Sequence, residues 1–309
     1  MIVVVIPAVA LAGLSLASFA GQWVWWLDVL ANFRAQFAIA LVLFGLVLLI
    51  SRWKKVAIGI LLVAGANLFF VAPLYVGSPG TSDPSAPSLR IVSFNLLSDN
   101  ESYGEVIEFI RVTEPDLVFL HEASRPWEVA LGSSNLNYEL IRARSDDLIF
   151  GTLILARDEI EAVSYGFGIG QPRAVSLAYH PDDWPVEVQI LTTHPLAPTT
   201  KERAGLRDAQ LDFASNWAAE QQGHYLVVGD LNATPWSWPF RNLVASGNLR
   251  NSQHGFGLQP SFSTMSNTIL RVPIDHLLHS DVLRIRDRRL GPPLGSDHFP
   301  LIVDLEYLP

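Results

Sequence analysis

Polar side chains that could bind a metal ion or a phosphate follow several predicted strands of this chain. The stretch LVVGDLNATP shows the pattern: residues 226–228 predict a buried strand, and Gly229 permits a bend where it ends. Asp230 and Asn232 are two positions apart and therefore point to one side. The carboxylate accepts protons or hydrogen bonds, and the carboxamide both donates and accepts them. The pair suits phosphate chemistry, although Asp and Asn at strand ends also commonly form turns.

The same arrangement recurs along the second part of the chain. Predicted strands over 89–95, 117–120 and 186–193 each lead into a polar residue. Two more polar residues, Asp297 and His298, lie just before the final predicted strand. Each residue alone has an ordinary explanation, such as a solvated Glu or a His satisfied in the core. Because strand ends converge on one edge of an α/β scaffold, we expect a shared site. Its candidate residues are Asn95, Glu122, His194, Asp230, Asn232, Asp297 and His298.

Helices and further strands separate these segments. Apolar residues recur with helical spacing over 103–113 and over 199–222, which predicts two helices. Short apolar or alternating apolar and polar runs, bounded by turn-forming residues, predict the β-strands. The remaining predicted elements are a hairpin over 138–156 with its turn at Ser145 to Asp147, a strand pair over 174–193, a short helix over 239–246, and strands over 274–278, 282–290 and 301–305.

The short sequences around the candidate residues resemble, in chain order, the motifs of the endonuclease/exonuclease/phosphatase superfamily. The resemblance covers residues 88 to 309 and implies a DNase I-like α/β fold. That fold is a four-layer α/β/β/α sandwich with two packed, mostly antiparallel sheets and the site at one edge. The motifs are Ser93-Phe94-Asn95, His121-Glu122, Thr193-His194-Pro195, Gly229-Asp230-Leu231-Asn232, Ile274-Asp275-His276 and Ser296-Asp297-His298.

The resemblance implies a metal site in which Glu122 is the main ligand and Asn95 and Asp297 lie near it. A hard divalent ion on carboxylates and several waters fits Mg²⁺, and Mn²⁺ can replace it on similar ligands. The chain has no cysteine, which excludes thiolate sites and disulfides. His121 stands where the family often has Gln, and no role is assigned to it. Leu97 stands where nuclease members often have an acidic residue, which weakens a specific prediction of abasic-site chemistry.

The resemblance also implies catalytic roles. Asp230 would orient or deprotonate the attacking water, and Asn232 would donate a hydrogen bond to the scissile phosphate. His298 would act on the phosphate or the water, held in one tautomer by Asp275, and His194 would donate to a phosphate oxygen. These roles agree with the physical need, because an anionic phosphate ester repels nucleophiles until its charge is neutralised.

Two other positions near these motifs have competing interpretations. Arg173 precedes an extended segment and could bind a substrate phosphate or form a surface salt bridge. Trp236 and Trp238 follow Asn232 and could form an apolar lip or pack in the core.

The first 76 residues differ in composition from the rest. Apolar stretches over 1–20, 31–50 and 56–75 predict three transmembrane helices, since about 20 apolar residues span a bilayer. The first stretch lacks the positive region of a signal peptide. The alternative is a buried helical hairpin of a soluble domain. The only charged residues in this part are Asp28, Arg34, Arg52, Lys54 and Lys55.

The loops predict the orientation. Three positive charges lie within residues 51–55, whereas the loop around Trp23, Trp25 and Trp26 suits the outer interface. The positive-inside rule therefore predicts a multi-pass protein of the cell membrane with an extracytoplasmic domain over 89–309. Residues 77–88, rich in Gly, Pro and Ser, are the predicted linker after the anchor of residues 1–76. With the THP and GDLNATPWS sequences, this arrangement is similar to the membrane-bound branch that includes VanJ-like glycopeptide-resistance proteins.

The charge of the outer domain bears on its substrate. Residues 77–309 contain 17 basic and 29 acidic residues, a formal charge of −12, which argues against a broad nucleic-acid surface. We therefore expect a phosphoesterase acting on a phosphorylated lipid, a lipid-linked pyrophosphate or another phosphoester at the outer leaflet. The alternative is a metal-dependent nuclease with a local basic groove that binds DNA. A non-catalytic binding module would need a lost catalytic residue, and no principal one is missing. No protein partner is implied.

Overall fold

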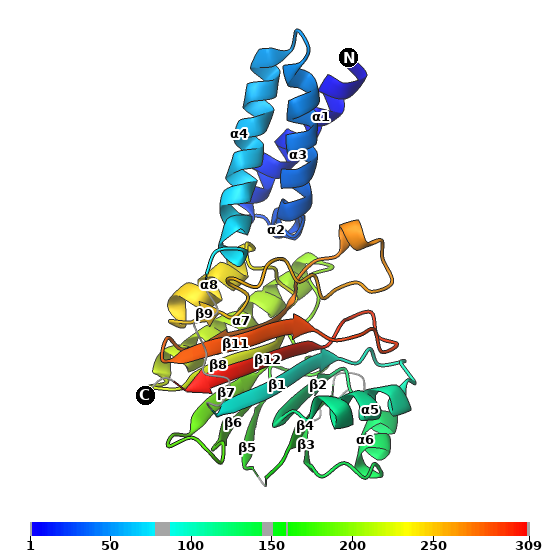
Figure 1. Cartoon of the computed structure of the whole chain (residues 1–309), viewed down its shortest axis with the longest axis vertical. Helices are drawn as coiled ribbons and strands as arrows, with labels where there is room; N and C mark the ends of the chain where they lie inside the picture. Colours follow the sequence, from blue (N-terminus) through cyan, green and yellow to red (C-terminus); the bar gives the residue numbers. More distant parts are fainter. Residues whose placement is uncertain (1, 78–86, 144–150, 159, 308–309) are drawn as a thin grey trace.

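The computed structural model describes residues 2–77, 87–143, 151–158 and 160–307. An N-terminal helical bundle stands on an α/β domain built from two packed sheets (Figure 1). The predicted turn at Ser145 to Asp147 and residues 78–86 of the predicted linker lie outside the described residues.

The first sheet has the strand order β11-β12-β1-β2-β4-β3. Only β1 and β2 run parallel, and α5 (Tyr103–Thr113) forms the crossover that a parallel pair requires. The strands are β1 (Ser88–Asn95), β2 (Leu117–His121), β3 (Glu139–Ala143), β4 (Thr152–Ala156), β11 (Leu283–Leu290) and β12 (Leu301–Tyr307).

The second sheet repeats this plan, with the order β5-β6-β7-β8-β10-β9. Its parallel pair is β7 with β8, and α7 (Lys201–Glu220) connects them. Both parallel pairs therefore present their carboxyl ends on one edge of the sandwich. The strands are β5 (Ala162–Tyr165), β6 (Ala174–Tyr179), β7 (Val188–Thr192), β8 (Tyr225–Asp230), β9 (Arg250–Asn251) and β10 (Asp275–His279).

Strand alternation divides the core into three apolar layers. Ile91 packs between the sheets with Phe119 and Val228, whereas its neighbour Val92 faces α5 and α6 (Arg125–Gly132). A third layer lies between the second sheet and the helices α7 and α8 (Trp238–Ser246). The four-layer α/β/β/α sandwich with mostly antiparallel sheets is confirmed. The short elements α6, β5 and β9 were not predicted from the sequence, and α2 (Trp25–Ala31) was expected to be a loop.

The N-terminal bundle contains α1 (Ile2–Ala17), α2 (Trp25–Ala31), α3 (Arg34–Leu49) and α4 (Lys54–Val71). Two helices, Ile2–Ala20 and Lys54–Leu74 with their terminal 3₁₀ turns, are long and apolar enough to cross a membrane. The helices α2 and α3 meet that criterion only together, and they bend by 65° at their junction. The structure thus supports two spans, and the third remains a prediction.

The short helix α2 turns aside because it packs against the domain. A carboxylate oxygen of Asp28 lies 3.0 Å from a guanidinium nitrogen of Arg207 on α7, and both side chains are buried. The other carboxylate oxygen of Asp28 accepts the backbone N–H of Trp238 at 2.8 Å. At the end of α4, the carbonyl of Leu74 accepts the N–H groups of Gly255 and Gly257. The anchor therefore contacts the domain directly.

The variant Asp28→Ala is expected to destabilise the full chain by about 3 kcal/mol, because it leaves Arg207 buried without this counter-charge. The thermal unfolding midpoint of detergent-purified protein measures the loss. Asp281→Ala is the control, because Asp281 and Arg250 form an exposed pair worth less than about 1 kcal/mol. Equal midpoints for the two variants would contradict a structural role for the buried pair.

The substitution Gly229→Ala is expected to cost about 2 kcal/mol or more, because β8 has no room for a Cβ at its end. An added Cβ would lie 2.0 Å from the backbone oxygen of Thr193 and 3.0 Å from Nε2 of His121, and φ is +148°. Thermal unfolding checks this, with Gly205→Ala as the control because nothing lies within 4 Å of its added Cβ. An unchanged midpoint for Gly229→Ala would refute the close approach.

Candidate active site

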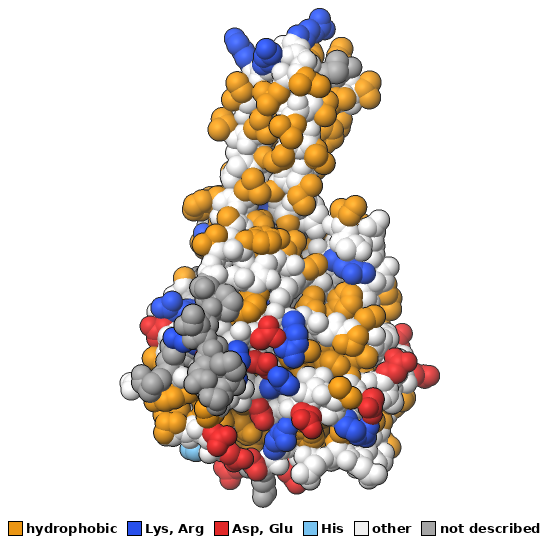
Figure 2. All heavy atoms as spheres, viewed as in Figure 1, with side chains coloured by type: hydrophobic (Ala, Val, Ile, Leu, Met, Phe, Trp, Pro, Cys, Tyr) orange, Lys and Arg blue, Asp and Glu red, His pale blue; other side chains and the backbone are white. Residues whose placement is uncertain are grey.

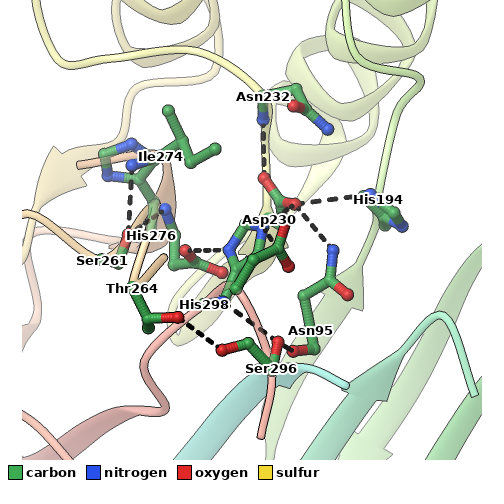
Figure 3. A network of polar contacts seen from close by, with 12 residues as sticks. Asn95, His194, Asp230, Asn232, Ser261, Thr264, Ile274, His276, Ser296 and His298 are labelled. Carbon is green, nitrogen blue, oxygen red and sulfur yellow. Dashed lines mark hydrogen bonds and ion pairs between the residues drawn. The ribbon is translucent and has the colours of Figure 1, made fainter. Parts of the chain in front are cut away.

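Four strand ends bring predicted site residues to one edge of the sandwich. Asn95 ends β1 and Glu122 follows β2 in the first sheet, while His194 follows β7 and Asp230 ends β8 in the second. All four line a cleft of about 230 Å³. Figure 3 shows Asn95, His194 and Asp230 pointing toward one another. Asn232, Asp297 and His298 line the same cleft, so the seven strand-end candidates are brought together.

The amide of Asn95 joins the two sheets. Its nitrogen donates to Glu122 Oε1 at 3.0 Å and to Asp230 Oδ2 at 3.1 Å. Its oxygen accepts the backbone N–H of Leu97 at 3.0 Å, which fixes the orientation of the amide. Asn95, expected near the metal, therefore directs donors at two carboxylates and holds them in place.

Asp230 is the centre of the polar network and is buried. Its Oδ2 lies 3.4 Å from Nε2 of His194 and 3.6 Å from Nε2 of His298. Its Oδ1 accepts the backbone N–H of Asn232 at 3.0 Å. The side-chain nitrogen of Asn232 donates to the carbonyl of Pro195 at 2.9 Å, which places its amide at the cleft.

Three residues just beyond the strands adopt left-handed backbone conformations. The φ angles of Leu97, Glu122 and Asn232 are +61°, +53° and +48°. Asn tolerates this region, but for Leu and Glu it costs on the order of 1 kcal/mol or more. Such strain persists only where surrounding contacts maintain it and often accompanies a functional site.

His298 is paired with Asp275 at the back of the cleft. Its Nδ1 lies 2.8 Å from Asp275 Oδ2, and its backbone N–H donates to the hydroxyl of Ser296. Burial lowers the pKa of His298, but the charges of Asp275 and Asp230 outweigh burial and raise that pKa to about 10. The hydroxyl of Ser261 accepts the N–H of Asp275 at 3.2 Å, which helps to fix this strand end. The imidazole is therefore held in one orientation and protonated at neutral pH.

The acidic residues of the cleft fit a hard divalent cation. Glu122, Asp230 and Asp297 all line it. Burial raises the pKa of Asp297, the charge of His298 opposes that rise, and the negative charges of Glu122 and Asp230 add to it. Asp230, Asp275 and His298 also offer ligand atoms within 4.8 Å of one another. Because His298 and Asp275 bond each other, the Glu122 and Asp297 side fits Mg²⁺ or Mn²⁺ better.

Four residues that line the cleft were not predicted from the sequence: the apolar Leu196 and Ala197, and also Arg203 and Phe262. Arg203, in the first turn of α7, is a basic residue at the cleft. The helix start at Thr200, whose hydroxyl accepts the N–H of Arg203, was the available signal. Phe262 lies in a loop with no motif, and its ring centroid is 4.8 Å from that of His298.

Other candidates lie elsewhere. Arg173 is not among the residues that line the cleft, because its guanidinium donates to the hydroxyl of Ser164 at 2.6 Å. His121 is fully buried behind the site, and burial keeps its pKa well below the usual value, so it is neutral. Trp236 packs against Ala31 and Leu74 of the anchor rather than forming a lip.

The Asp275–His298 pair predicts a pH-dependent stability. The folded pKa of about 10 exceeds the ordinary value near 6.5, so the contribution is complete below about pH 6.5 and lost as pH rises toward 10. In metal-chelating buffer, the difference in unfolding midpoint between wild type and Asp275→Asn should therefore shrink from pH 6 to pH 10. The exposed Asp281→Asn should show no such trend, and a constant difference for Asp275→Asn would refute the pairing.

Comparison with solved structures shows the same fold. The chain superimposes on humanized D. rerio TDP2 (16% identity, TM-score 0.58, 71% of this chain and 99% of that chain). It also superimposes on the human Nocturnin catalytic domain with bound sulfate (19%, 0.56, 72% and 94%) and on an endonuclease/exonuclease/phosphatase from Bacteroides vulgatus (16%, 0.60, 72% and 99%). A comparison with curated protein sequences gives no match. The sequence profile of the Endonuclease/Exonuclease/phosphatase family matches residues 92–298, two thirds of the chain and all six motifs. The chain therefore belongs to the endonuclease/exonuclease/phosphatase family.

Proposed function

We propose that this protein is a membrane-anchored, metal-dependent phosphoesterase that hydrolyses a phosphate ester or pyrophosphate of a lipid or lipid-linked substrate. The observation that carries the proposal is the junction at Asn95, whose amide holds Glu122 and Asp230 together at one cleft. This junction supports the proposal, because it holds Glu122, the proposed metal ligand, near Asp230, the residue proposed to orient or deprotonate the attacking water.

Each residue has a role that follows from its position. Glu122 and Asp297 would hold a divalent cation, which would neutralise part of the phosphate charge. Asp230 lies where it can orient or deprotonate the attacking water. Asn232 and His194 offer side-chain donors to phosphate oxygens at the same cleft.

His298 is the candidate proton donor. Its Nδ1 is engaged by Asp275, which leaves Nε2 facing the cleft and Asp230. A protonated imidazole at this point can stabilise negative charge on the phosphate or give a proton to the leaving oxygen. Arg203 adds positive charge at the rim.

The bundle favours a substrate in the membrane. The basic loop between α3 and α4 lies at the end of the bundle remote from the domain (Figures 1 and 2). If that end is cytoplasmic, the domain lies outside, as the positive-inside rule predicts. The similarity to VanJ-like proteins points to an undecaprenyl-pyrophosphate-type lipid as one candidate.

A nuclease is the second candidate, because one D. rerio TDP2 relative in fold was solved with a single-strand DNA product. The charge of the cleft argues against it. Among the described residues that line the cleft, Arg203 is the one Arg or Lys. Tight DNA binding depends on several phosphate contacts from such residues.

Purified full-length protein, supplied with Mg²⁺ or Mn²⁺, is expected to release phosphate or head group from lipid phosphates or pyrophosphates. Glu122→Gln should lower the rate by about 10²–10³-fold, because it removes a charged metal ligand. The matched control is Glu220→Gln, an exposed residue at the end of α7. Addition of EDTA should abolish turnover.

The same preparations are tested for plasmid nicking. DNA cleavage that Glu122→Gln abolishes, with no lipid turnover, would establish the nuclease instead. No turnover of either substrate class would count against both functions.

A further inference from the structure

A loop beside the active site exposes apolar side chains. Residues 262–272 form this loop, which is closed at its base by the N–H of Phe262 donating to the carbonyl of Val272. Its apolar tip consists of Met265, Ile269 and Leu270, whose exposed fractions are 71%, 71% and 56%. Single exposed apolar residues are ordinary, but three within six positions indicate a contact surface.

The loop lies at the level of the membrane end of the domain. Figure 1 shows it rising toward the base of the bundle, beside α2 and α3. Gln36, in the first turn of α3, donates to the carbonyls of Ile269 and Arg271, each at 3.0 Å. The tip is therefore fixed against the bundle itself.

Aromatic side chains are also exposed around the base of the bundle. Trp23 and Trp26 flank the start of α2, and Tyr75 follows α4, with exposed fractions of 75%, 50% and 61%. Figure 2 shows hydrophobic side chains both on the bundle and on the shoulder of the domain beside it. Trp and Tyr are enriched at the interface between bilayer and water.

The same loop is bonded to the catalytic residues. Phe262 lines the cleft and contacts His298, as described above. The N–H of Thr264 donates to the carbonyl of Asp297 at 2.8 Å, and its hydroxyl donates to the carbonyl of Ser296 at 2.6 Å. The apolar tip and the cleft wall are thus two ends of one short segment.

Chain length limits the distance between the tip and the cleft. Met265 is three residues from Phe262, so their Cα atoms are at most about 11 Å apart. Ile269 is likewise three residues from Val272. The head-group layer of each leaflet is roughly 5–8 Å thick. A tip at the edge of the hydrocarbon therefore keeps the cleft rim close to the lipid phosphates.

We propose that the apolar tip of the 262–272 loop inserts into the lipid bilayer and holds the cleft at the membrane surface, so that the phosphate of a membrane lipid enters it directly. The contact with the bilayer requires only that α1 and α4 span the membrane. The choice of a lipid phosphate as substrate rests on the proposed function.

Fluorescence tests the contact without any assay of activity. The chain has no cysteine, so Ile269→Cys and Val163→Cys each create one labelling site. Val163 is 56% exposed on β5, at the end of the domain remote from the bundle (Figure 1). Each full-length variant carries an environment-sensitive nitrobenzoxadiazole label in vesicles of phosphatidylcholine and phosphatidylglycerol.

At position 269 we expect blue-shifted emission that falls when spin-labelled phospholipids are included. At position 163 we expect no effect of those lipids and strong quenching by aqueous iodide. Equal iodide quenching at both positions, with no lipid quenching at 269, would overturn the proposal.

A second measurement tests substrate access. The double variant Ile269→Ser/Leu270→Ser replaces two exposed apolar side chains of the tip and should not disturb the core. The ratio of its rate on a vesicle lipid phosphate to its rate on a water-soluble short-chain analogue should fall about tenfold relative to wild type. An unchanged ratio would overturn the role in access. If wild type hydrolyses neither substrate, the proposed function fails, and the fluorescence result still decides the membrane contact.

Discussion

The repulsion among three carboxylates is the constraint on which this site depends. Glu122, Asp230 and Asp297 come from three distant segments and line one cleft. Two unit charges 4 Å apart near a protein surface repel by about 4 kcal/mol, so the apposition needs compensation. The amide of Asn95 supplies part of it, and protonated His298 supplies more. The remaining negative charge is what a divalent cation would neutralise. The fold must therefore bring like charges together and keep them there.

The two parallel strand pairs bring the carboxylates together at the cleft, and the N-terminal bundle supports the same region from its opposite side. Arg207 donates to the backbone carbonyl of Asn232 at 3.0 Å and to the buried Asp28 of α2. The segment after β8 is thus held between the cleft and the bundle. Trp236, four residues after Asn232, packs against the anchor. The N-terminal bundle and the loop after β8 consequently share one packed interface.

Much of the fold and most of the site were predictable because both leave local patterns. Strands such as residues 226–228 are short apolar runs, and the candidate site residues occur in ordered motifs where such runs end. Arg203 was missed because the helix start at Thr200 is a weaker signal than a motif, and Phe262 was missed because its irregular loop carries no signal. Arg173 precedes β6 in sequence, yet its side chain bonds Ser164 on β5 instead. Hydropathy predicted a second span over residues 31–50 after a loop, whereas the structure has two helices, α2 and α3, that bend by 65° at their junction. Hydropathy has no means of detecting that Asp28 is matched to Arg207 on a helix nearly 180 residues away, the contact that turns α2 aside.

The docking of the bundle has a consequence for a chain that is broken between the bundle and the α/β domain. Here a cut between residues 78 and 86 would sever the backbone but leave the Asp28–Arg207 pair and the apolar cluster around Trp236 intact. The two fragments should stay associated, because separation would expose the apolar cluster around Trp236 to water. The bundle and the α/β domain are therefore held together by side-chain packing as well as by the peptide chain.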